Sequence, residues 1–458
     1  MANPSIVVVI DQSGSMGTWG YLAPAQTDAS TFINIMNVGD RLGVVAFSDS
    51  SSVIVPASGT QIVTVQSLVQ LFAAAQTVMQ LRSLNMTNFV AALASSHTLI
   101  DPAPAPRGIV FLSDGLWNTG GDPMPGLATN VPIHTIALGA NGQLTALQTM
   151  AQRTGGQYHF TPDAVGLGQI YNQIAGTTQV ASLVANATPT VGQFRYTSTP
   201  GIIPASATQA SFALSWDDRS VVYTPNTPQG QQVNVFLYDP TGQRVNTQAS
   251  ATGPGYVVFR IPSPIAGTYT AYAWYSGTGS LTYTAGIFDD ASSVQLNLEM
   301  SPAGSSSGTS SSPAADSGSG AGGPADFTVR FTDDGEPVAG AHVEVSVESP
   351  LRTLADALEM YGPAIAGMAV GEDVPPERAD EARLASYAAG AGLTGVVLPR
   401  VEQPVPVREI EPGVYAAQLP VGGLLAGSHT VRITATGDGP RTGGRVMRSA
   451  RTSFHVPS

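Results

Sequence analysis

Oxygen-bearing side chains gather at one point of the sequence and recur at two later points. Asp11, Ser13 and Ser15 form a D-x-S-x-S motif directly after an apolar run, Thr87 precedes a predicted helix, and Asp114 follows a second apolar run. Carboxylate and hydroxyl oxygens are hard donors, which suit Mg²⁺, Mn²⁺ or Ca²⁺ rather than thiophilic metals. The five residues therefore predict one divalent-metal site, provided that the fold brings the three segments together.

The elements that must position these residues alternate along the first 178 residues. Short, apolar, β-branched runs are typical of buried parallel strands, and longer stretches with helical spacing lie between them. The predicted strands are residues 6–10, 42–47, 53–55, 109–112 and 133–138, and the predicted helices are residues 25–38, 65–81, 89–99, 144–154 and 167–174. This order predicts a doubly wound α/β (Rossmann-like) domain over residues 1–178. Ligands of such sheets bind outside the carboxyl ends of the strands, where Asp11 and Asp114 follow theirs.

The order of these residues resembles the metal-ion-dependent adhesion site of the von Willebrand factor A family. Residues 39–47 and 133–139 also resemble the family's second strand and the strand after its aspartate loop. By this resemblance, Ser13, Ser15 and Thr87 contact the metal, and Asp11 and Asp114 act directly or through water. The expected cofactor is Mg²⁺, with Mn²⁺ or Ca²⁺ as alternatives.

A site with only two carboxylates predicts a binding function. Mg²⁺ dehydrates reluctantly and would keep water at such a site, so at least one position stays exchangeable. An Asp or Glu carboxylate of a protein ligand could take that position. The expected function is a non-enzymatic, metal-dependent adhesion or scaffold protein. The alternative is an intracellular regulatory partner of an ATPase or an assembly that uses the same site.

The remaining sequence predicts two β modules. Short alternating strands over residues 181–300 indicate a β-sandwich, residues 301–326 read as a flexible linker rich in Ser, Gly and Pro, and residues 327–458 indicate an immunoglobulin- or fibronectin-like sandwich. An insertion at about 351–392 is expected to form one or two helices that pack against this last sandwich or bind a partner. The module order resembles calcium-activated chloride channel regulators and their bacterial relatives, but the protease motif H-E-x-x-H of those proteins is absent here.

Composition and motifs argue against other classes of function. The net charge of -13 disfavours nucleic acid and anionic membranes as partners, and the absence of cysteine excludes thiolate chemistry. No apolar segment is long enough for a membrane span, and no signal peptide precedes the first strand, so the chain is cytoplasmic if it is complete. Its module types instead suggest the cell surface.

The six histidines never show metal-ligand spacing, and neither a nucleophile elbow nor a phosphate-binding loop is present, so an enzyme is not expected. The oligomeric state stays open.

Overall fold

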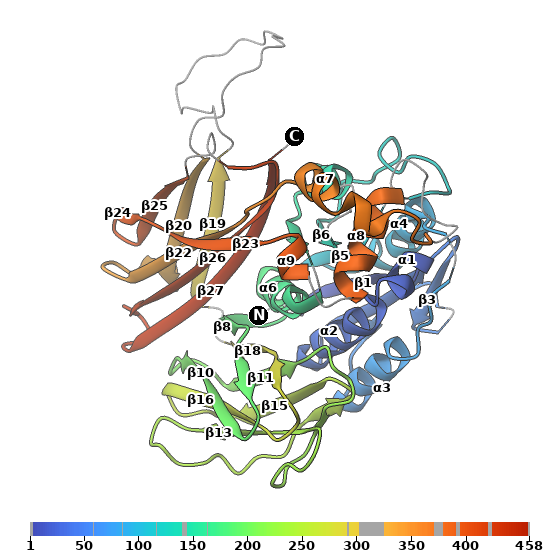
Figure 1. Ribbon diagram of the computed structural model, residues 1–458. Coiled ribbons are helices and arrows are strands. Elements are labelled where there is room, and N and C mark those ends of the chain that lie inside the picture. Colours follow the sequence, from blue (N-terminus) through green and yellow to red (C-terminus); the bar gives the residue numbers. More distant parts are fainter. Residues whose placement is uncertain are drawn as a thin grey trace.

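The chain folds into three modules that pack against one another in this computed structural model. Figure 1 shows an α/β module in blue to teal, a second module in green to yellow, and a third module in orange to red. The structure describes residues 3–57, 59–84, 86–115, 117–139, 144–162, 164–290, 293–301, 325–370, 379–390, 394–419 and 424–456.

The α/β module is built on a seven-stranded sheet with the order β3-β2-β1-β5-β6-β7, and β4 pairs with β2. Strands β1, β2, β5, β6 and β7 are parallel, whereas β3 and β4 run antiparallel to β2. The strands are β1 (Ser5–Asp11), β2 (Arg41–Phe47), β3 (Ser51–Val55), β4 (Val63–Thr64), β5 (Arg107–Ser113), β6 (Ile133–Leu138) and β7 (Tyr158–Thr161). Strand β1 is buried over its whole length and β5 is buried from Gly108 to Ser113, because both faces of the sheet are covered.

Helices cover the two faces of this sheet, and alternate residues of β1 show both layers. Val8 belongs to the apolar cluster that contains Phe32 of α2 and Ile174 of α6, and Val7 belongs to the cluster that contains Phe89 of α4. The helices are α1 (Gly14–Thr18), α2 (Leu22–Ile35), α3 (Leu68–Val78), α4 (Phe89–Ile100), α5 (Leu144–Thr154) and α6 (Leu167–Thr177), with a 3-10 turn η1 (Ala164–Gly166) before α6. The predicted elements all occur, although α2 is shifted by three residues toward the N-terminus.

The second module consists mainly of two sheets that share one apolar cluster, and their strands are antiparallel except for the parallel pair β12 and β13. The sheet β14-β15-β11-β18-β8 packs against α2, so the sheet β10-β16-β13-β12 forms the outer layer (Figure 1). A short pair, β9 and β17, lies beside them. The strands are β8 (Ser182–Ala187), β9 (Thr190–Gly192), β10 (Arg195–Ile203), β11 (Gln209–Ser215), β12 (Val222–Tyr223), β13 (Gln232–Tyr238), β14 (Ala251–Gly253), β15 (Tyr256–Pro262), β16 (Gly267–Tyr275), β17 (Ser280–Thr282) and β18 (Thr284–Asp289).

The third module also has two sheets with a common cluster, in the orders β19-β20-β25-β24 and β23-β22-β26-β27, and β21 pairs with β20. Its strands are β19 (Val294–Ser301), β20 (Ala325–Asp333), β21 (Glu336–Pro337), β22 (His342–Pro350), β23 (Arg400–Val405), β24 (Val407–Glu411), β25 (Val414–Leu419), β26 (Gly427–Asp438) and β27 (Arg445–Val456).

The position of β19 corrects the predicted role of the linker. β19 pairs antiparallel with β20 from Val294 opposite Asp333 to Ser301 opposite Asp326. The strand therefore lies in the sheet of the third module, although residues 181–300 were assigned to the second. The segment 301–326 joins two neighbouring strands of one sheet and is not a spacer between modules. Its predicted flexibility concerns residues 302–324, which lie outside the described residues.

The insertion at about 351–392 packs against a module other than the one predicted. It forms α7 (Leu354–Ile365), α8 (Ala379–Gly390) and α9 (Thr394–Val397), and a capping box between Thr353 and Asp356 starts α7. These helices share a small apolar cluster of their own. Ala382 of α8 belongs to the cluster of the α/β module, and Val370 packs against that cluster. The insertion therefore extends from the third module onto the α/β module, and does not pack only on the sandwich that carries it (Figure 1).

Buried arginines join the modules. Arg448 of β27 makes two hydrogen bonds of 2.9 and 3.0 Å to the carboxylate of Asp289 in β18, and the two side chains are 3% and 0% exposed. Arg260 of β15 donates to the carbonyl oxygens of Asn34 and Met36 at the end of α2, where the helix dipole favours a cation. These contacts hold the second module against both of its neighbours.

The third module covers one edge of the α/β sheet. Phe160 of the edge strand β7 donates its N–H to Ser453 Oγ, and its carbonyl oxygen accepts from Arg451, both residues of β27. Polar groups of an exposed sheet edge would otherwise be open to pairing with another chain. Among the described residues, no helix is long and apolar enough to cross a membrane.

Candidate metal-binding site

Ser13, Ser15 and Asp114 are linked by hydrogen bonds at the carboxyl edge of the sheet. The Oγ atoms of Ser13 and Ser15 are 3.1 Å apart, and Ser15 Oγ donates to Asp114 Oδ1 over 3.0 Å. The two segments meet because β1 and β5 are adjacent parallel strands, so that their following loops leave the sheet side by side. The structure thus brings together three of the five predicted residues through their side chains.

Asp11 lies behind these hydroxyl groups and holds the loop. One carboxylate oxygen accepts the N–H of Ser13 at 2.8 Å, and the other accepts the hydroxyl of Ser113 at 2.6 Å. Asp11 is fully buried. Its carboxylate fixes the turn from β1 into α1, which presents Ser13 and Ser15 toward Asp114.

Thr87 reaches the same edge through its backbone. Its N–H donates to Asn118 Oδ1 at 2.8 Å, and its carbonyl oxygen accepts the N–H of Asn118 at 3.0 Å. Asn118 is in the loop that begins at Asp114. The Thr87 hydroxyl takes no part in the hydrogen bonds that join Ser13, Ser15 and Asp114. Thr87 is therefore joined to the loop of Asp114 through hydrogen bonds of its backbone.

Supporting residues were missed by sequence reasoning. Ser83 Oγ donates to the carbonyl oxygen of Ser13 at 3.0 Å, and a methyl group on Gly17 would come within 2.5 Å of the Ser83 side chain. Gly17 thus allows the segment before Thr87 to approach α1. Ser113 could have been noticed because it adjoins Asp114, but no local pattern marks Ser83 or Asn118, whose partners are distant in sequence.

The donor set fits a hard cation. Among the described residues, no three His, Cys, Asp or Glu side chains gather into a group that could hold a metal ion. A cation at this edge would therefore depend on hydroxyl oxygens besides the carboxylates of Asp11 and Asp114. Hydroxyl and carboxylate oxygens suit Mg²⁺, Mn²⁺ or Ca²⁺, whereas zinc sites are dominated by nitrogen and sulfur. Ser15 is 9% exposed, so the cluster lies just beneath the surface.

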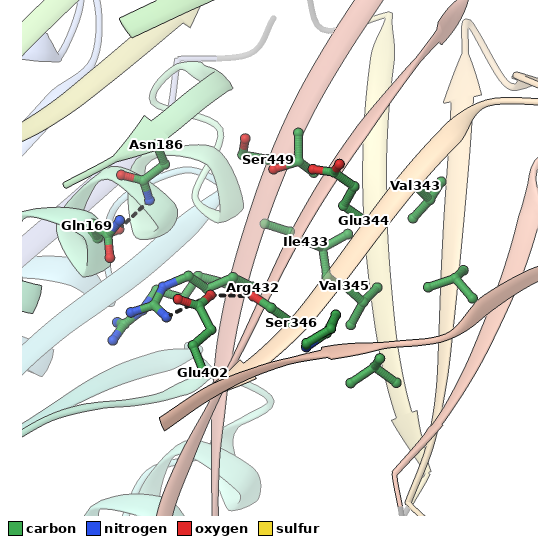
Figure 2. Close-up of a pocket in the computed structure, with 16 residues that line it drawn as sticks. Gln169, Asn186, Val343, Glu344, Val345, Ser346, Glu402, Arg432, Ile433 and Ser449 are labelled. Carbon is green, nitrogen blue, oxygen red and sulfur yellow. Dashed lines mark hydrogen bonds and ion pairs between the residues drawn. The ribbon is translucent and has the colours of Figure 1, made fainter. Parts of the chain in front are cut away.

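A separate cavity of about 500 Å³ lies between the third module and the elements α6 and β8. Figure 2 shows Gln169 and Asn186 of α6 and β8 together with Glu402 and Arg432 of the third module among the residues that line it. Arg432 lies 3.3 Å from Glu402, and Asn186 donates to the carbonyl oxygen of Gln169 at 2.9 Å. None of the five predicted metal ligands lines this cavity.

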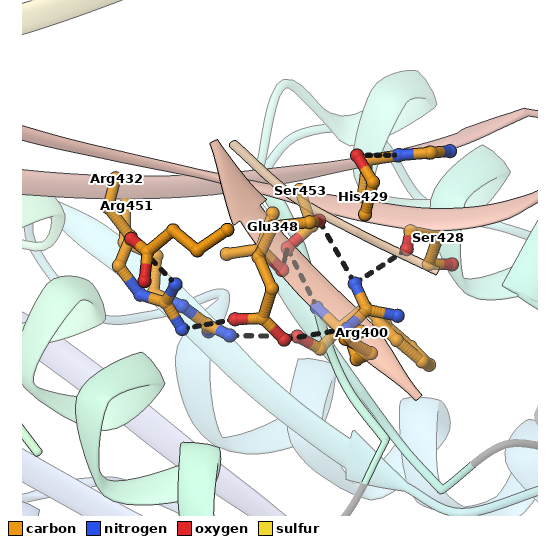
Figure 3. A network of polar contacts seen from close by, with 11 residues as sticks. Glu348, Arg400, Ser428, His429, Arg432, Arg451 and Ser453 are labelled. Atoms are coloured by element: carbon orange, nitrogen blue, oxygen red, sulfur yellow. Dashed lines mark hydrogen bonds and ion pairs between the residues drawn. The ribbon is translucent and has the colours of Figure 1, made fainter. Parts of the chain in front are cut away.

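The charges beside the cavity are paired with one another. Figure 3 shows Glu348 between Arg400 and Arg432, and both arginines form ion pairs with its carboxylate. Burial alone would raise the pKa of Glu348, but the two guanidinium groups hold it below its ordinary value. We therefore interpret this network as part of the third module's framework.

Comparisons with known proteins agree with the fold of the first module. Residues 6–116 match the family described as von Willebrand factor type A domain. No curated protein matches the chain. The solved structure of a von Willebrand factor type A protein from Catenulispora acidiphila is 15% identical, with a TM-score of 0.36, and the match covers 73% of this chain and 63% of that chain.

Two further solved structures are similar to parts of the chain. The ArnB paralog VWA2 from Sulfolobus acidocaldarius is 13% identical, with a TM-score of 0.30, over 73% of this chain and 62% of that chain. The vWF domain of the type V pili tip protein Mfa5 from Porphyromonas gingivalis is 15% identical, with a TM-score of 0.29, over 38% of this chain and 95% of that domain. The chain spans less than two thirds of the Catenulispora and Sulfolobus proteins. The predicted resemblance is confirmed for the N-terminal module, which contains a von Willebrand factor type A domain matched over residues 6–116.

Proposed function

We propose that this chain is a non-enzymatic protein-binding protein, an adhesin or scaffold, whose von Willebrand factor type A domain captures an acidic residue of a partner through a divalent metal ion. The observation that carries the proposal is the cluster of Ser13, Ser15 and Asp114, joined by hydrogen bonds of 3.1 and 3.0 Å across two loops. Asp11 and Thr87 complete the proposed set of metal ligands.

The chemistry of the cluster supports Mg²⁺, with Mn²⁺ or Ca²⁺ as alternatives. Bound there, the ion would supply a positive charge that attracts a carboxylate. Asp11 and Asp114 are the two acidic residues of the proposed set, and they would neutralise the ion only in part, so that it still attracts an acidic ligand. The hydroxyl groups of Ser13 and Ser15 add oxygen atoms without adding charge. The residues of the chain thus orient the ion and keep the site receptive to an acid group.

The other modules are proposed to hold this recognition domain. We assign the second module as a β-sandwich and the third as an immunoglobulin- or fibronectin type III-like sandwich, on the support of two packed sheets in each. The buried pair of Arg448 and Asp289 ties these two modules together.

Metal binding is tested by thermal unfolding of the whole chain with and without Mg²⁺ or Mn²⁺. A ligand at about 100 times its dissociation constant should stabilise the folded protein by roughly 2–3 kcal/mol. Asp114→Ala should abolish this gain, and Asp122→Ala, an exposed carboxylate in the same domain, should leave it intact. An unchanged unfolding midpoint of the wild type in saturating metal would refute the metal site.

Partner capture is tested by a pull-down in Mg²⁺ and in EDTA, with bound proteins identified by mass spectrometry. Proteins retained in Mg²⁺ should be lost in EDTA and should also be lost with Asp114→Ala. The Asp122→Ala protein should retain them. Capture that persists equally in EDTA would contradict a metal-bridged contact even if the metal itself binds.

A further inference from the structure

A cluster of aromatic side chains covers part of the outer layer of the second module. We call Tyr196, Phe236, Tyr238, Tyr272 and Trp274 the aromatic face. Trp274 of β16 lies opposite Tyr196 of β10 and Asn234 of β13, and Tyr272 lies opposite Ser198 and Phe236. Residues directly opposite one another in a sheet project from the same side. The five rings therefore share one side of the sheet β10-β16-β13-β12.

This side of the sheet faces solvent. The opposite side carries Val235, Tyr269 and Ala271, which are buried in the cluster shared with the sheet that packs on α2. Tyr196 is 59% exposed, and the other four aromatic residues are partly exposed. A solvated face of an antiparallel sheet normally alternates polar residues with the buried ones. Contiguous apolar surface at such positions marks an interaction site in many soluble proteins.

The rings form a continuous strip across three strands. Phe236 and Tyr272 are parallel to within 8° with centroids 5.6 Å apart, and Tyr196 and Trp274 are also 5.6 Å apart. Tyr196 contacts Phe236 edge-on at 5.9 Å, and Tyr238 contacts Tyr272 at 5.5 Å. Every ring thus touches another ring of the strip. The mutual packing holds the side chains in place, so that little conformational freedom remains to be lost when a ligand binds.

Polar groups accompany the rings. Three of the five residues are tyrosines, whose phenol oxygens have no hydrogen-bond partner among the described residues. Ser198 and Thr270 lie between the aromatic positions on the same side of the sheet. A ligand with many hydroxyl groups could therefore stack its ring faces on the strip and hydrogen-bond to these oxygens.

One cationic side chain lies at this face, although the chain as a whole has a net charge of -13. The guanidinium of Arg244 lies over the ring of Phe236 at 5.3 Å from its centroid. The carboxylate nearest in sequence is Asp239, which accepts hydrogen bonds from the backbone N–H groups of Thr241 and Gln243 within its own turn. Arg244 is thus the cation available to a ligand on the strip, and it favours an anionic occupant.

We propose that the aromatic face binds an acidic polysaccharide, a chain of uronic acid residues. The sugar rings stack on Tyr196, Trp274 and the Phe236–Tyr272 pair. The tyrosine phenols bond to sugar hydroxyl groups, and Arg244 pairs with a sugar carboxylate. An extended peptide would instead add along an edge strand, because strand addition uses backbone groups at a sheet edge rather than a face.

The proposal is tested with the full chain by affinity electrophoresis in gels that contain polygalacturonate or, as a neutral comparison, hydroxyethylcellulose. Polygalacturonate should retard the protein far more strongly than the neutral polymer. Tyr196→Ala and Trp274→Ala should each weaken retardation roughly tenfold, the effect of losing one stacking contact. Phe72→Ala, which removes a 38% exposed aromatic ring of α3, should have no effect. Arg244→Gln should weaken binding of polygalacturonate roughly fivefold and leave the neutral polymer unchanged.

The outcomes separate this proposal from its alternatives. Equal retardation by both polymers, or retardation that survives both aromatic substitutions, would overturn it. A protein that is not retarded but forms a concentration-dependent dimer would also overturn the proposal. If Trp274→Ala dissociates that dimer, the face binds a second copy of the chain. EDTA should not alter retardation, since the face and the metal-binding loops lie in different modules. Failure of the proposed metal site would therefore leave this result untouched, and the reverse also holds.

Discussion

Ser15 and Asp114 are 99 positions apart in the chain, yet Ser15 Oγ donates a hydrogen bond of 3.0 Å to Asp114 Oδ1. This contact is the point at which the loops after β1 and β5 join. It also links the two serine hydroxyl groups to the Asp114 carboxylate, because Ser15 Oγ lies 3.1 Å from Ser13 Oγ.

Loss of a single hydroxyl of the cluster should weaken metal binding. Ser15→Ala is expected to lower the affinity for Mn²⁺ by at least about tenfold, because it removes an oxygen of the proposed ligand set and the contact that orients Asp114. Isothermal titration calorimetry of the full chain measures the change. Thr18→Ala is the control and should bind as the wild type does, because it removes a hydroxyl at the end of α1 that donates to the carbonyl oxygen of Gly14. Wild-type affinity in Ser15→Ala would exclude Ser15 as a ligand.

The buried pair of Arg448 and Asp289 should be far more sensitive than any pair at the surface. Arg448→Met leaves the Asp289 carboxylate without its cation in a buried interface, which should cost about 3–5 kcal/mol in the free energy of unfolding. The double substitution Arg448→Met with Asp289→Leu should recover much of that loss. The exposed pair of Arg330 and Glu299 is the control, and Arg330→Met should cost less than about 1 kcal/mol. Urea unfolding measures all four proteins.

Acid should destabilise the protein through two buried histidines. Burial lowers the pKa of His134 to about 4, and burial together with the nearby charge of Arg451 lowers the pKa of His159 well below its ordinary value. The unfolded chain therefore binds protons below about pH 6.5 that the folded chain does not bind. The stability that each neutral histidine contributes is therefore fully present above about pH 6.5 and is lost as the pH falls. For each histidine, the folding equilibrium constant decreases by about tenfold per pH unit.

His159→Phe isolates one of these contributions. Neither ring nitrogen of His159 has a hydrogen-bond partner among the described residues, so the substitution removes no such bond. Urea unfolding between about pH 5 and about pH 8 measures how the free energy of unfolding depends on pH. Below about pH 6.5, the slope of this dependence should be smaller than in the wild type by about one proton. Asp40, whose pKa is raised to about 6 by burial, contributes a slope of opposite sign, but it is present in both proteins and cancels from the difference. An unchanged slope would contradict the burial of a neutral His159.

The contact between the insertion and the α/β module should depend on one small side chain. Ala382 is buried in the apolar cluster of that module, so Ala382→Arg should force α8 away from it. Hydrogen exchange should then rise in α7 and α8, while strands β22 and β26 keep their protection. Glu381→Arg, on the neighbouring position of the same helix, is the control for added charge. Equal exchange in the wild type and in Ala382→Arg would show that α8 is not held by this contact.

The α/β module was predictable because its signals are local. Each of β1, β2, β5 and β6 is an apolar run with a turn at its end, and the D-x-S-x-S motif follows one of them directly. The parallel order then places Asp11 and Asp114 at one edge without any knowledge of side-chain contacts. The metal itself and the role of Thr87 stay predictions, since its hydroxyl does not join the hydrogen-bonded cluster.

The assignments that failed concern which surface an element packs against. β19 has the alternation of a strand, but alternation defines the two faces of a strand and not its neighbour in a sheet. Its pairing with β20 spans the segment 302–324, over which no local signal acts. In the same way, the helical spacing of the insertion predicts α7 and α8, but the small side chain of Ala382 gives no sign that it contacts a module hundreds of residues earlier.

The antiparallel ladder between β19 and β20 has one more consequence. A protease that cut the chain anywhere within residues 302–324 would produce two fragments, each carrying one strand of an eight-residue ladder. The fragments would stay associated until the sheet itself was denatured, so a nicked sample would run as one species on a sizing column and as two on a denaturing gel. The same segment is thus a place where an affinity tag could be inserted between two strands that already pair with each other.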